Sequence, residues 1–280
     1  MKEKIKKKDK VVFISGAAGG LGSALVKIFV KNSYRVIAAD VAIMDLPDPE
    51  GNGKIHYKKL DITNLKQIDA LRDELALHQS GLDILINAAG IYDSFPLTEA
   101  DPDVFMQMMN VNLHGAVNLV QSMLDPLIKN KGRVIVVTSE SYKIQALFQP
   151  YMVSKASLEA YCRVARQELA LKGVKLTVIR PGAINTPLLK WMKSPVASEK
   201  YPVYNEELKK SWEQSVKIVG RISSPETVAR KIFKAATDTY PKRVYRINNS
   251  ILLNLVSILP NSFFEWLMIK MFRLKNNERP

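Results

Sequence analysis

Short apolar runs alternate with longer segments of helical period along most of the chain. The runs are VVFIS (11–15), YRVIAAD (34–40), KIHYKKL (54–60), LDILINA (82–88), RVIVVTS (133–139) and VKLTVIR (174–180). Runs of this length and composition are typical of strands in a parallel sheet that is covered on both faces. Helical patterns lie between them, near 20–32, 64–78, 102–128 and 151–172. The sequence therefore predicts an α/β fold: a Rossmann-type, doubly wound parallel sheet with helices on both faces.

The rest of the chain extends this prediction. KRVYRI (242–247) predicts a last strand, which makes about seven, and SPETVARKIFKAAT before it opens with the Ser-Pro-Glu of a helix start. Residues 187–220 mix proline, lysine and aromatic side chains without a clear strand, so we expect a lid of loops and helix over a substrate. A chain of 280 residues is an ordinary length for one α/β domain, which we place at 11–248.

Basic residues gather at both ends of the chain, and the net charge of +14 favours polyanionic partners. Residues 1–10 hold six lysines and predict a basic, disordered arm. Residues 249–280 form an apolar and basic extension that Pro260 divides, so it is a poor membrane span. Its apolar residues recur at helical spacing, which fits packing on the substrate pocket or a partner subunit, or peripheral contact with a membrane. We expect no nucleic-acid partner.

Cysteine and histidine usage narrows the compartment and the chemistry. Cys162 is the single cysteine, and no apolar run follows the charged start of the sequence, so we expect a cytoplasmic protein that is possibly membrane-associated. His56, His78 and His114 lie far apart with no cysteine at ligand spacing. No metal site is predicted.

A glycine-rich turn follows the first apolar run. Gly16, Gly20 and Gly22 in SGAAGGLG open the first predicted helix, where backbone N–H groups can approach a pyrophosphate. Asp40 ends the second predicted strand, 18 residues after Gly22. A carboxylate there can accept hydrogen bonds from ribose hydroxyls and would repel a 2′-phosphate, which favours NAD over NADP.

Tyr151 and Lys155 form a YxxxK pair after the fifth strand. Four residues apart on a helix, they project from one face. Ser139 lies at the carboxyl end of the preceding strand, where ligand chemistry gathers in such sheets. An ammonium about 4 Å from a phenol contributes about 4 kcal/mol at an effective dielectric of about 20, which corresponds to about 3 pKa units. The pair is therefore suited to a phenolic acid/base.

These motifs, in this order, resemble the short-chain dehydrogenase/reductase family over about residues 10–247. The GxxxGxG spacing after Ser15, LDIT (60–63), NAAG (87–90), Asn112 in NVNLHG, YxxxK and Pro181-Gly182 are each similar to a family motif. The resemblance implies that Tyr151 is the acid/base, that Lys155 lowers its pKa and holds the nicotinamide ribose, and that Ser139 bonds the substrate oxygen. Asn112 would complete a water-mediated proton relay through Lys155.

The same resemblance implies the residues that contact the cofactor. They are Gly16, Gly20, Leu21, Gly22, Asp40, Asp61, Ile62, Asn87, Ala88, Gly90, Tyr151, Lys155, Pro181, Gly182, Ile184 and Thr186. NADP-preferring members carry Lys or Arg near the glycine turn or after the acidic position, whereas this chain has Gly19, Val41 and Ala42 there.

The position of the catalytic serine is left with alternatives. Ser139 stands 12 residues before Tyr151, a spacing that resembles the retinol and hydroxysteroid dehydrogenase branch. Many family members use a spacing of 13, which here is Thr138, and Ser141 is a third candidate.

We therefore expect an NAD-dependent oxidoreductase that acts on a lipophilic alcohol or carbonyl compound, such as a steroid, retinoid or fatty alcohol. Apolar residues in the lid, among them Leu188 and Trp191, and no obvious arginine clamp favour such a substrate. One alternative is an NAD(P)H-dependent reductase of 3-oxoacyl or small carbonyl compounds. Another is a non-catalytic, membrane-peripheral NAD-binding module. The resemblance also implies a homodimer or homotetramer assembled through helices 102–128 and 151–172.

Overall fold

The structure is a computed structural model that describes residues 10–42, 54–77, 81–143, 146–193, 197–250 and 259–273. Residues 1–9 of the predicted N-terminal arm and residues 251–258 and 274–280 of the predicted C-terminal extension lie outside the described residues.

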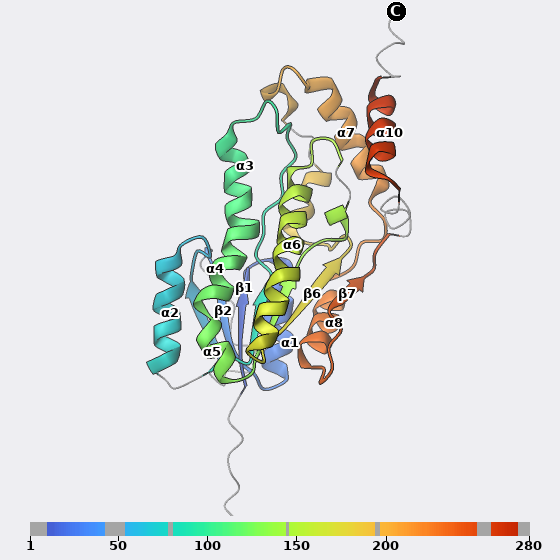
Figure 1. The fold of residues 1–280 in the computed structure, drawn as a ribbon. Coiled ribbons are helices and arrows are strands. Elements are labelled where there is room, and N and C mark those ends of the chain that lie inside the picture. Colours follow the sequence, from blue (N-terminus) through green and yellow to red (C-terminus); the bar gives the residue numbers. More distant parts are fainter. Residues whose placement is uncertain are drawn as a thin grey trace, which may run out of the picture.

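Seven parallel strands form one sheet in the order β3-β2-β1-β4-β5-β6-β7, which confirms the predicted Rossmann-type fold (Figure 1). The strands are β1 (Val11–Ser15), β2 (Arg35–Asp40), β3 (Ile55–Lys59), β4 (Ile84–Asn87), β5 (Arg133–Val137), β6 (Lys175–Pro181) and β7 (Val244–Ile247). The order reverses direction between β1 and β4, and this switch point is where open α/β sheets bind ligands.

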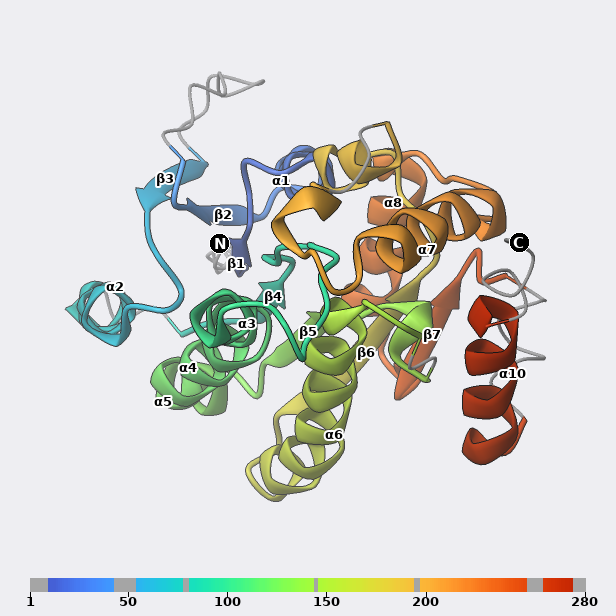
Figure 2. The ribbon, with the colours of Figure 1, turned by 90° about the horizontal axis from the view of Figure 1, so that it is seen from above.

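Helices cover both faces of the sheet (Figure 2). The described residues form the helices α1 (Gly20–Lys31), α2 (Leu65–Leu77), α3 (Pro102–Met109), the π-helical η1 (Asn110–His114), α4 (Gly115–Ser122), α5 (Leu124–Lys129), α6 (Pro150–Leu171), α7 (Asn205–Ile218), α8 (Pro225–Thr237) and α10 (Asn261–Arg273), the last of which lies beyond β7 and covers neither face. The described connections also contain the short 3-10 turns η2 (Glu140–Lys143), η3 (Pro187–Met192) and η4 (Ser198–Lys200).

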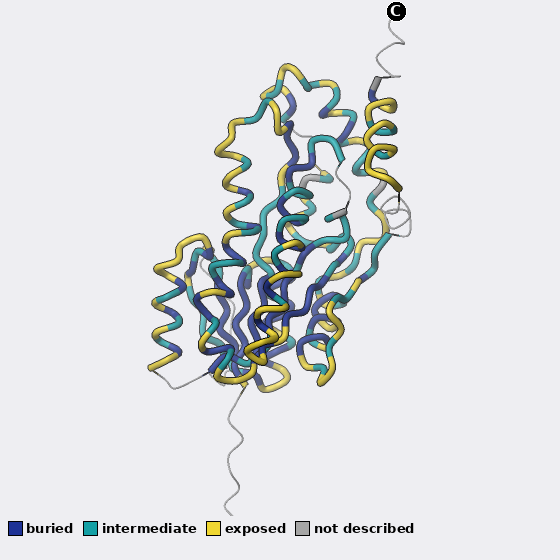
Figure 3. The backbone as a smooth tube through the Cα atoms, viewed as in Figure 1, coloured by how far each residue is buried: buried dark blue, intermediate teal, exposed yellow. Residues whose placement is uncertain are grey.

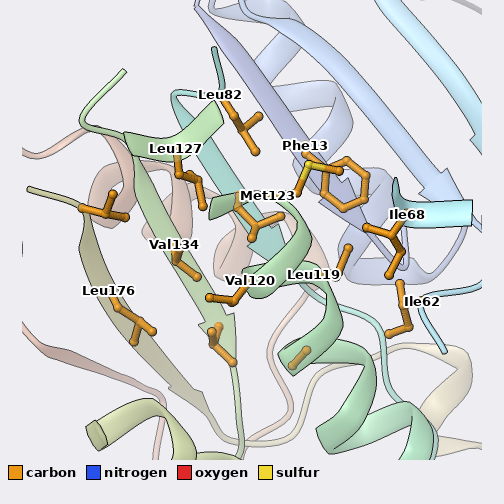
Figure 4. Packing of buried hydrophobic residues seen from close by; sticks show 14 of the residues in the cluster. Phe13, Ile62, Ile68, Leu82, Leu119, Val120, Met123, Leu127, Val134 and Leu176 are labelled. Atoms are coloured by element: carbon orange, nitrogen blue, oxygen red, sulfur yellow. The ribbon is translucent and has the colours of Figure 1, made fainter. Parts of the chain in front are cut away.

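Alternation along the strands builds two separate cores. Phe13 points into the core that α2, α4 and α6 cover, where it joins Leu119 and Leu158 (Figure 4). Its neighbour Ile14 points to the other face and packs with Phe29 of α1. Figure 3 shows the result, with buried strands between helices that expose their outer sides. Both faces of the sheet are buried, which explains the nearly continuous apolar strands.

The predicted helix over 102–128 is interrupted twice. At Asn110–His114 the backbone takes one π-helical turn, in which the Gly115 N–H bonds to the Asn110 carbonyl. The helix breaks again at Met123, because Pro126 has no N–H to continue the hydrogen-bond ladder and its ring crowds the preceding turn. Single π turns are often found at functional sites, and this one carries Asn112.

The predicted lid segment contains η3, η4 and the fourteen-residue helix α7. It packs on loops at the carboxyl end of the sheet: the Tyr204 ring lies 5.4 Å from that of Phe148, and the Tyr204 hydroxyl accepts a hydrogen bond from Thr98. The Val203 N–H also donates to the Glu99 carboxylate. Among the described residues, no helix is both long and apolar enough to cross a membrane.

Candidate active site

Two glycines of the glycine-rich turn have no room for a side chain. Gly16 has a φ of +68°, and a Cβ added to it would lie 2.7 Å from the backbone nitrogen of Ala89. A Cβ on Gly22 would overlap the Gly16 carbonyl oxygen. No side chain caps the N-terminus of α1, so its first N–H groups remain available to an anion. The turn therefore fits a dinucleotide pyrophosphate.

The NAAG motif joins this turn to the centre of the sheet. The Ser15 hydroxyl donates to the Asn87 side-chain oxygen at 2.7 Å, and both residues are buried. Ala88, next in the chain, packs against the core beneath α1. A Cβ on Gly90 would lie 3.2 Å from the Asn112 side-chain oxygen and 3.4 Å from the Lys155 Nζ. Gly90 thus separates the glycine-rich turn from the proposed catalytic groups.

Asp40 reaches back over the glycine-rich turn from the end of β2. One of its carboxylate oxygens accepts a hydrogen bond from the Ala18 N–H and the other from the Ala42 N–H, each at 3.0 Å. These bonds hold the carboxylate beside the turn, at the place where an adenosine ribose extends in such folds. Val41, which follows, is exposed and uncharged.

Asp61 and Ile62 lie where the chain leaves β3. The Asp61 carboxylate accepts hydrogen bonds from the Thr63 N–H and hydroxyl, both at 2.8 Å. The Ile62 carbonyl accepts one from Asn118 on α4, and the Ile62 side chain lies against Gly115. This loop is therefore held against the helix that follows Asn112.

The segment after β6 crosses the glycine-rich turn from the other side. The methyl group of Thr186 lies 2.9 Å from the position of a Cβ added to Gly20, a residue that precedes Leu21 and opens α1. Ile184 pairs with Ser223 through an isolated parallel bridge. Gly182, after Pro181, donates its N–H to the Ile247 carbonyl at 2.9 Å. The predicted cofactor residues that end or follow β1, β2, β3, β4 and β6 thus lie at the carboxyl end of the sheet.

The YxxxK pair lies at this same carboxyl end of the sheet, in the first turns of α6. The Lys155 Nζ stands 5.5 Å from the centre of the Tyr151 ring and donates a long hydrogen bond of 3.4 Å to the Val137 carbonyl. Lys155 is buried, and Tyr151 is half-buried against the ring of Tyr92 at 5.1 Å. The Tyr151 phenol forms a side-chain hydrogen bond with Ser139.

The structure separates the three candidates for the catalytic hydroxyl. The Thr138 hydroxyl is buried, donates to Glu159 at 2.7 Å and also lies 3.1 Å from the Ile179 carbonyl. It therefore belongs to the core. The Ser139 and Ser141 hydroxyls lie 2.8 Å apart, and Ser139 is the one that contacts Tyr151. This geometry favours Ser139, with Ser141 as its support.

Asn112 is fully buried, and both the oxygen and the nitrogen of its side-chain amide form hydrogen bonds. Its oxygen accepts from the Ile91 N–H, and its nitrogen donates to the Ile91 carbonyl and to the Ser154 hydroxyl, each at 2.9 Å. Ser154 in turn donates to the Tyr151 carbonyl. Asn112 therefore ties the π turn to the loop after Gly90 and to the first turn of α6. A part in a proton relay remains a proposal.

Burial opposes the charged forms of both members of the pair. Desolvation raises the pKa of Tyr151, the nearby Tyr92 raises it further, and the hydrogen bond with Ser139 lowers it. Desolvation also lowers the pKa of Lys155 to about 8. Within the chain alone, burial therefore outweighs the hydrogen bond with Ser139 and holds the Tyr151 pKa above its ordinary value.

Lys155 is therefore expected to destabilise the fold. Its folded pKa of about 8 lies below the ordinary 10.5, so the cost of burying the ammonium is fully present below pH 8 and disappears as the pH rises toward 10.5. A fall of about 2.5 units corresponds to about 3 kcal/mol. Urea unfolding should show Lys155→Met more stable than the wild type by about that amount near neutral pH, with a smaller gain in alkali.

The exposed Lys172, at the end of α6, provides the matched control for that measurement. Lys172→Met should change stability by less than about 0.5 kcal/mol. If Lys155→Met unfolds more easily than the wild type at both pH values, the assigned cost is wrong.

Two pairs of residues around the site escaped the sequence analysis. Glu159 on α6 and Arg180 on β6 form a buried ion pair with two hydrogen bonds of 2.8 Å. Tyr92 donates to Gln149 at 3.0 Å and lies on the Tyr151 ring. A charged residue within an apolar strand was the available signal for Arg180. Within the described residues, no His, Cys, Asp and Glu side chains group as a metal site would require.

A doubly wound parallel sheet with this turn and this YxxxK helix defines a dinucleotide-dependent oxidoreductase. The family profile described as short chain dehydrogenase matches residues 10–196. The chain therefore belongs to the short chain dehydrogenase family, whose members use a nicotinamide cofactor.

Known relatives extend beyond that matched region. The chain is 28% identical over 254 residues to human 17-beta-hydroxysteroid dehydrogenase type 6, covering 89% of this chain and 75% of the relative. It is 29% identical over 238 residues to the Thermotoga maritima 3-oxoacyl-[acyl-carrier-protein] reductase FabG, covering 82% and 91%.

A crystal structure of a short chain dehydrogenase from Burkholderia cenocepacia, in complex with NADP, has the same fold. Its TM-score is 0.69 at 21% identity, over 89% of this chain and 92% of that one.

Proposed function

We propose that this chain is an NAD-dependent oxidoreductase that interconverts a lipophilic alcohol and its ketone or aldehyde. The observation that carries the proposal is that Tyr151, Lys155 and Ser139 lie at the carboxyl end of the sheet, where the glycine-rich turn also lies. Bound NAD would accept hydride from the alcohol carbon. The residues of the chain would bind, orient and move a proton at the alcohol oxygen.

Tyr151 would take that proton, with Ser139 holding the oxygen in line. Because the pKa of Tyr151 is raised in the chain alone, the phenolate needs further positive charge beside it. Lys155 supplies some, and the positively charged ring of NAD would supply more. Asn112 and Ser154 hold the turn of α6 that carries both residues, so they would act by positioning.

The preference for NAD rests on Asp40. Its carboxylate is fixed beside the turn by two backbone N–H groups, and the residues that follow it, Val41 and Ala42, carry no charge. A 2′-phosphate would meet the negative charge of this carboxylate, and neither residue that follows it offers a compensating positive charge.

A lipophilic substrate is supported by the lid and by one relative. Leu188 in η3 and Val203 before α7 expose apolar side chains in the segment after β6. The human relative is named for a hydroxysteroid. The Thermotoga maritima relative, named for a 3-oxoacyl carrier-protein substrate, supports the alternative of a 3-oxoacyl reductase.

A substrate panel decides between these two activities. Absorbance of the reduced nicotinamide is followed with hydroxysteroids, retinol, fatty alcohols and small secondary alcohols, and with 3-oxoacyl thioesters in the reverse direction. The highest kcat/KM should belong to a lipophilic alcohol. A higher value for 3-oxoacyl thioesters would replace this proposal with the alternative.

We also propose that the chain is a homodimer, or a tetramer of two dimers, assembled through α3 and α6. Met106 on α3 and Val164 on α6 are apolar and exposed in the single chain, at 46% and 57%. Light scattering should give at least twice the 31.5 kDa mass of one chain. Met106→Glu/Val164→Glu should give single chains, whereas Leu77→Glu, at the exposed end of α2, should not. Dimers that persist in the double variant would place the interface elsewhere.

The state of the single cysteine supports our proposal for the location of the protein. The single cysteine, Cys162, is buried, and burial raises the pKa of its thiol to about 12. An unreactive thiol and no disulfide are compatible with the cytoplasm, where we place the protein. A membrane-peripheral binding module without turnover is the remaining alternative, and substitution of Tyr151 tests it.

A further inference from the structure

The C-terminal helix α10 is apolar around most of its circumference. Phe264, Met268 and Phe272 recur every four residues, are half-buried or buried, and so form its inner face. Phe263, Trp266 and Ile269 recur every three residues on the outer side and remain exposed at 46%, 52% and 45%. A helix that is apolar on both sides requires cover on both, and the chain itself covers one.

The position of α10 leaves its outer face open. The helix lies beyond the β7 edge of the sheet, at the end where the strands finish, and stands apart from the other helices (Figures 1 and 2). Figure 3 shows its outer side as exposed. Exposed aromatic side chains that form a continuous surface with apolar neighbours usually mark an interaction site.

The positive charge near the outer face of α10 favours an anionic partner. The Lys270 Nζ lies 4.8 Å from the centre of the Trp266 ring, so a cation sits beside the apolar face. Arg246 on β7 and Arg221 are exposed close to where the chain leaves the sheet for α10, since the Asn248 side chain bonds the Arg221 carbonyl. The whole chain carries +14. A second copy would bring the same positive charge, whereas an anionic bilayer attracts it.

We propose that Phe263, Trp266 and Ile269 insert α10 into the interface of an anionic lipid bilayer, with Lys270 at the headgroups. Tryptophan and lysine suit this interface because each has an apolar body and a polar end. The helix lies on the bilayer and does not cross it. Aromatic insertion and electrostatic attraction together provide the two contributions that stable peripheral binding needs.

The chain between β7 and α10 contacts the candidate active site at Ser250. The Ser250 N–H donates to the Glu140 carboxylate at 2.6 Å, and Glu140 follows Ser139. The same carboxylate lies against Gly182. Docking would therefore hold the site near the bilayer, from which a lipophilic alcohol can enter. This consequence, unlike the docking itself, rests on the proposed function.

Sedimentation with vesicles tests the proposal. Full-length protein should pellet with phosphatidylcholine vesicles that contain phosphatidylserine, pellet weakly with phosphatidylcholine alone, and be released by high salt. Phe263→Ser/Trp266→Ser/Ile269→Ser should weaken binding at least about tenfold. The control Leu77→Ser/Leu171→Ser/Tyr240→Ser removes three apolar side chains that are more exposed, at 84%, 86% and 87%, from other elements. It should pellet like the wild type.

Fluorescence keeps the test valid if the α10 variant does not fold. The chain has three tryptophans, and the double variant Trp191→Phe/Trp212→Phe retains only Trp266. Its emission should shift to the blue with phosphatidylserine vesicles. Equal pelleting of the α10 variant and the wild type, or no shift, overturns the proposal. So does an α10 variant that loses a dimer by light scattering and keeps its vesicle binding, because a second copy would then cover the face. None of these measurements depends on turnover.

Discussion

Tyr151→Phe should lower kcat by about 10³-fold or more while NADH binding stays within about twofold, because the variant removes only a proton donor and acceptor. The phenyl ring keeps its contact with Tyr92 at 5.1 Å. Stopped assays with the best alcohol of the panel give kcat, and quenching of protein fluorescence by NADH gives the binding constant.

Tyr92→Phe is the matched control for that variant. Tyr92 contacts the Tyr151 ring and donates to Gln149. Burial raises the pKa of Tyr92 to about 12, so it stays neutral near pH 7. Loss of its hydroxyl should cost about 1 kcal/mol of stability and less than tenfold in kcat. If Tyr92→Phe lowers kcat as much as Tyr151→Phe, the assignment of the acid/base to Tyr151 fails. If Tyr151→Phe keeps its kcat, catalysis by the YxxxK pair fails.

The second large effect concerns cofactor choice. Asp40→Asn removes the charge but keeps an oxygen that can accept from the Ala18 or Ala42 N–H. Loss of a repulsion worth about 2 kcal/mol should lower the ratio of kcat/KM for NAD to that for NADP by roughly 30-fold. Steady-state assays with both cofactors and one alcohol measure this ratio.

Asp61→Asn is the control for the cofactor ratio. Asp61 bonds Thr63 within its own loop, so this variant should raise the KM for both cofactors alike and leave the ratio unchanged. A wild type that prefers NADP, or an Asp40→Asn variant with an unchanged ratio, would refute the role given to Asp40.

The sheet was predictable from the sequence because its strands are buried on both faces. A strand such as β1, whose residues alternate between two cores, must be apolar throughout, and this leaves a clear signal. Helices α1, α6 and α8 follow from their periodicity and, in α8, from the Ser224 cap and the proline after it. The glycine-rich turn after the first strand was also recognisable, although the reversal of strand order between β1 and β4 was seen only in the structure.

The finer geometry of the site was not predictable, because it depends on contacts between distant segments. Thr138 and Ser139 are adjacent and chemically similar, and only the buried Glu159 carboxylate determines that Thr138 turns inward. The π turn at Asn112 leaves no periodic signal, because it adds a single residue to one turn. The pKa of Lys155 depends on how deeply α6 buries it, which the YxxxK spacing does not reveal.

The most direct test of the central claim follows the transferred hydrogen itself. The wild type is incubated with NAD and the best lipophilic alcohol of the panel, deuterated at the carbon that carries the hydroxyl, and the nicotinamide product is analysed by mass spectrometry. We predict reduced cofactor that carries the deuterium, together with the ketone or aldehyde, and formation of both at least about 10³-fold slower with Tyr151→Phe. Bound NAD that acquires no deuterium from any alcohol of the panel would contradict the account and favour a binding module.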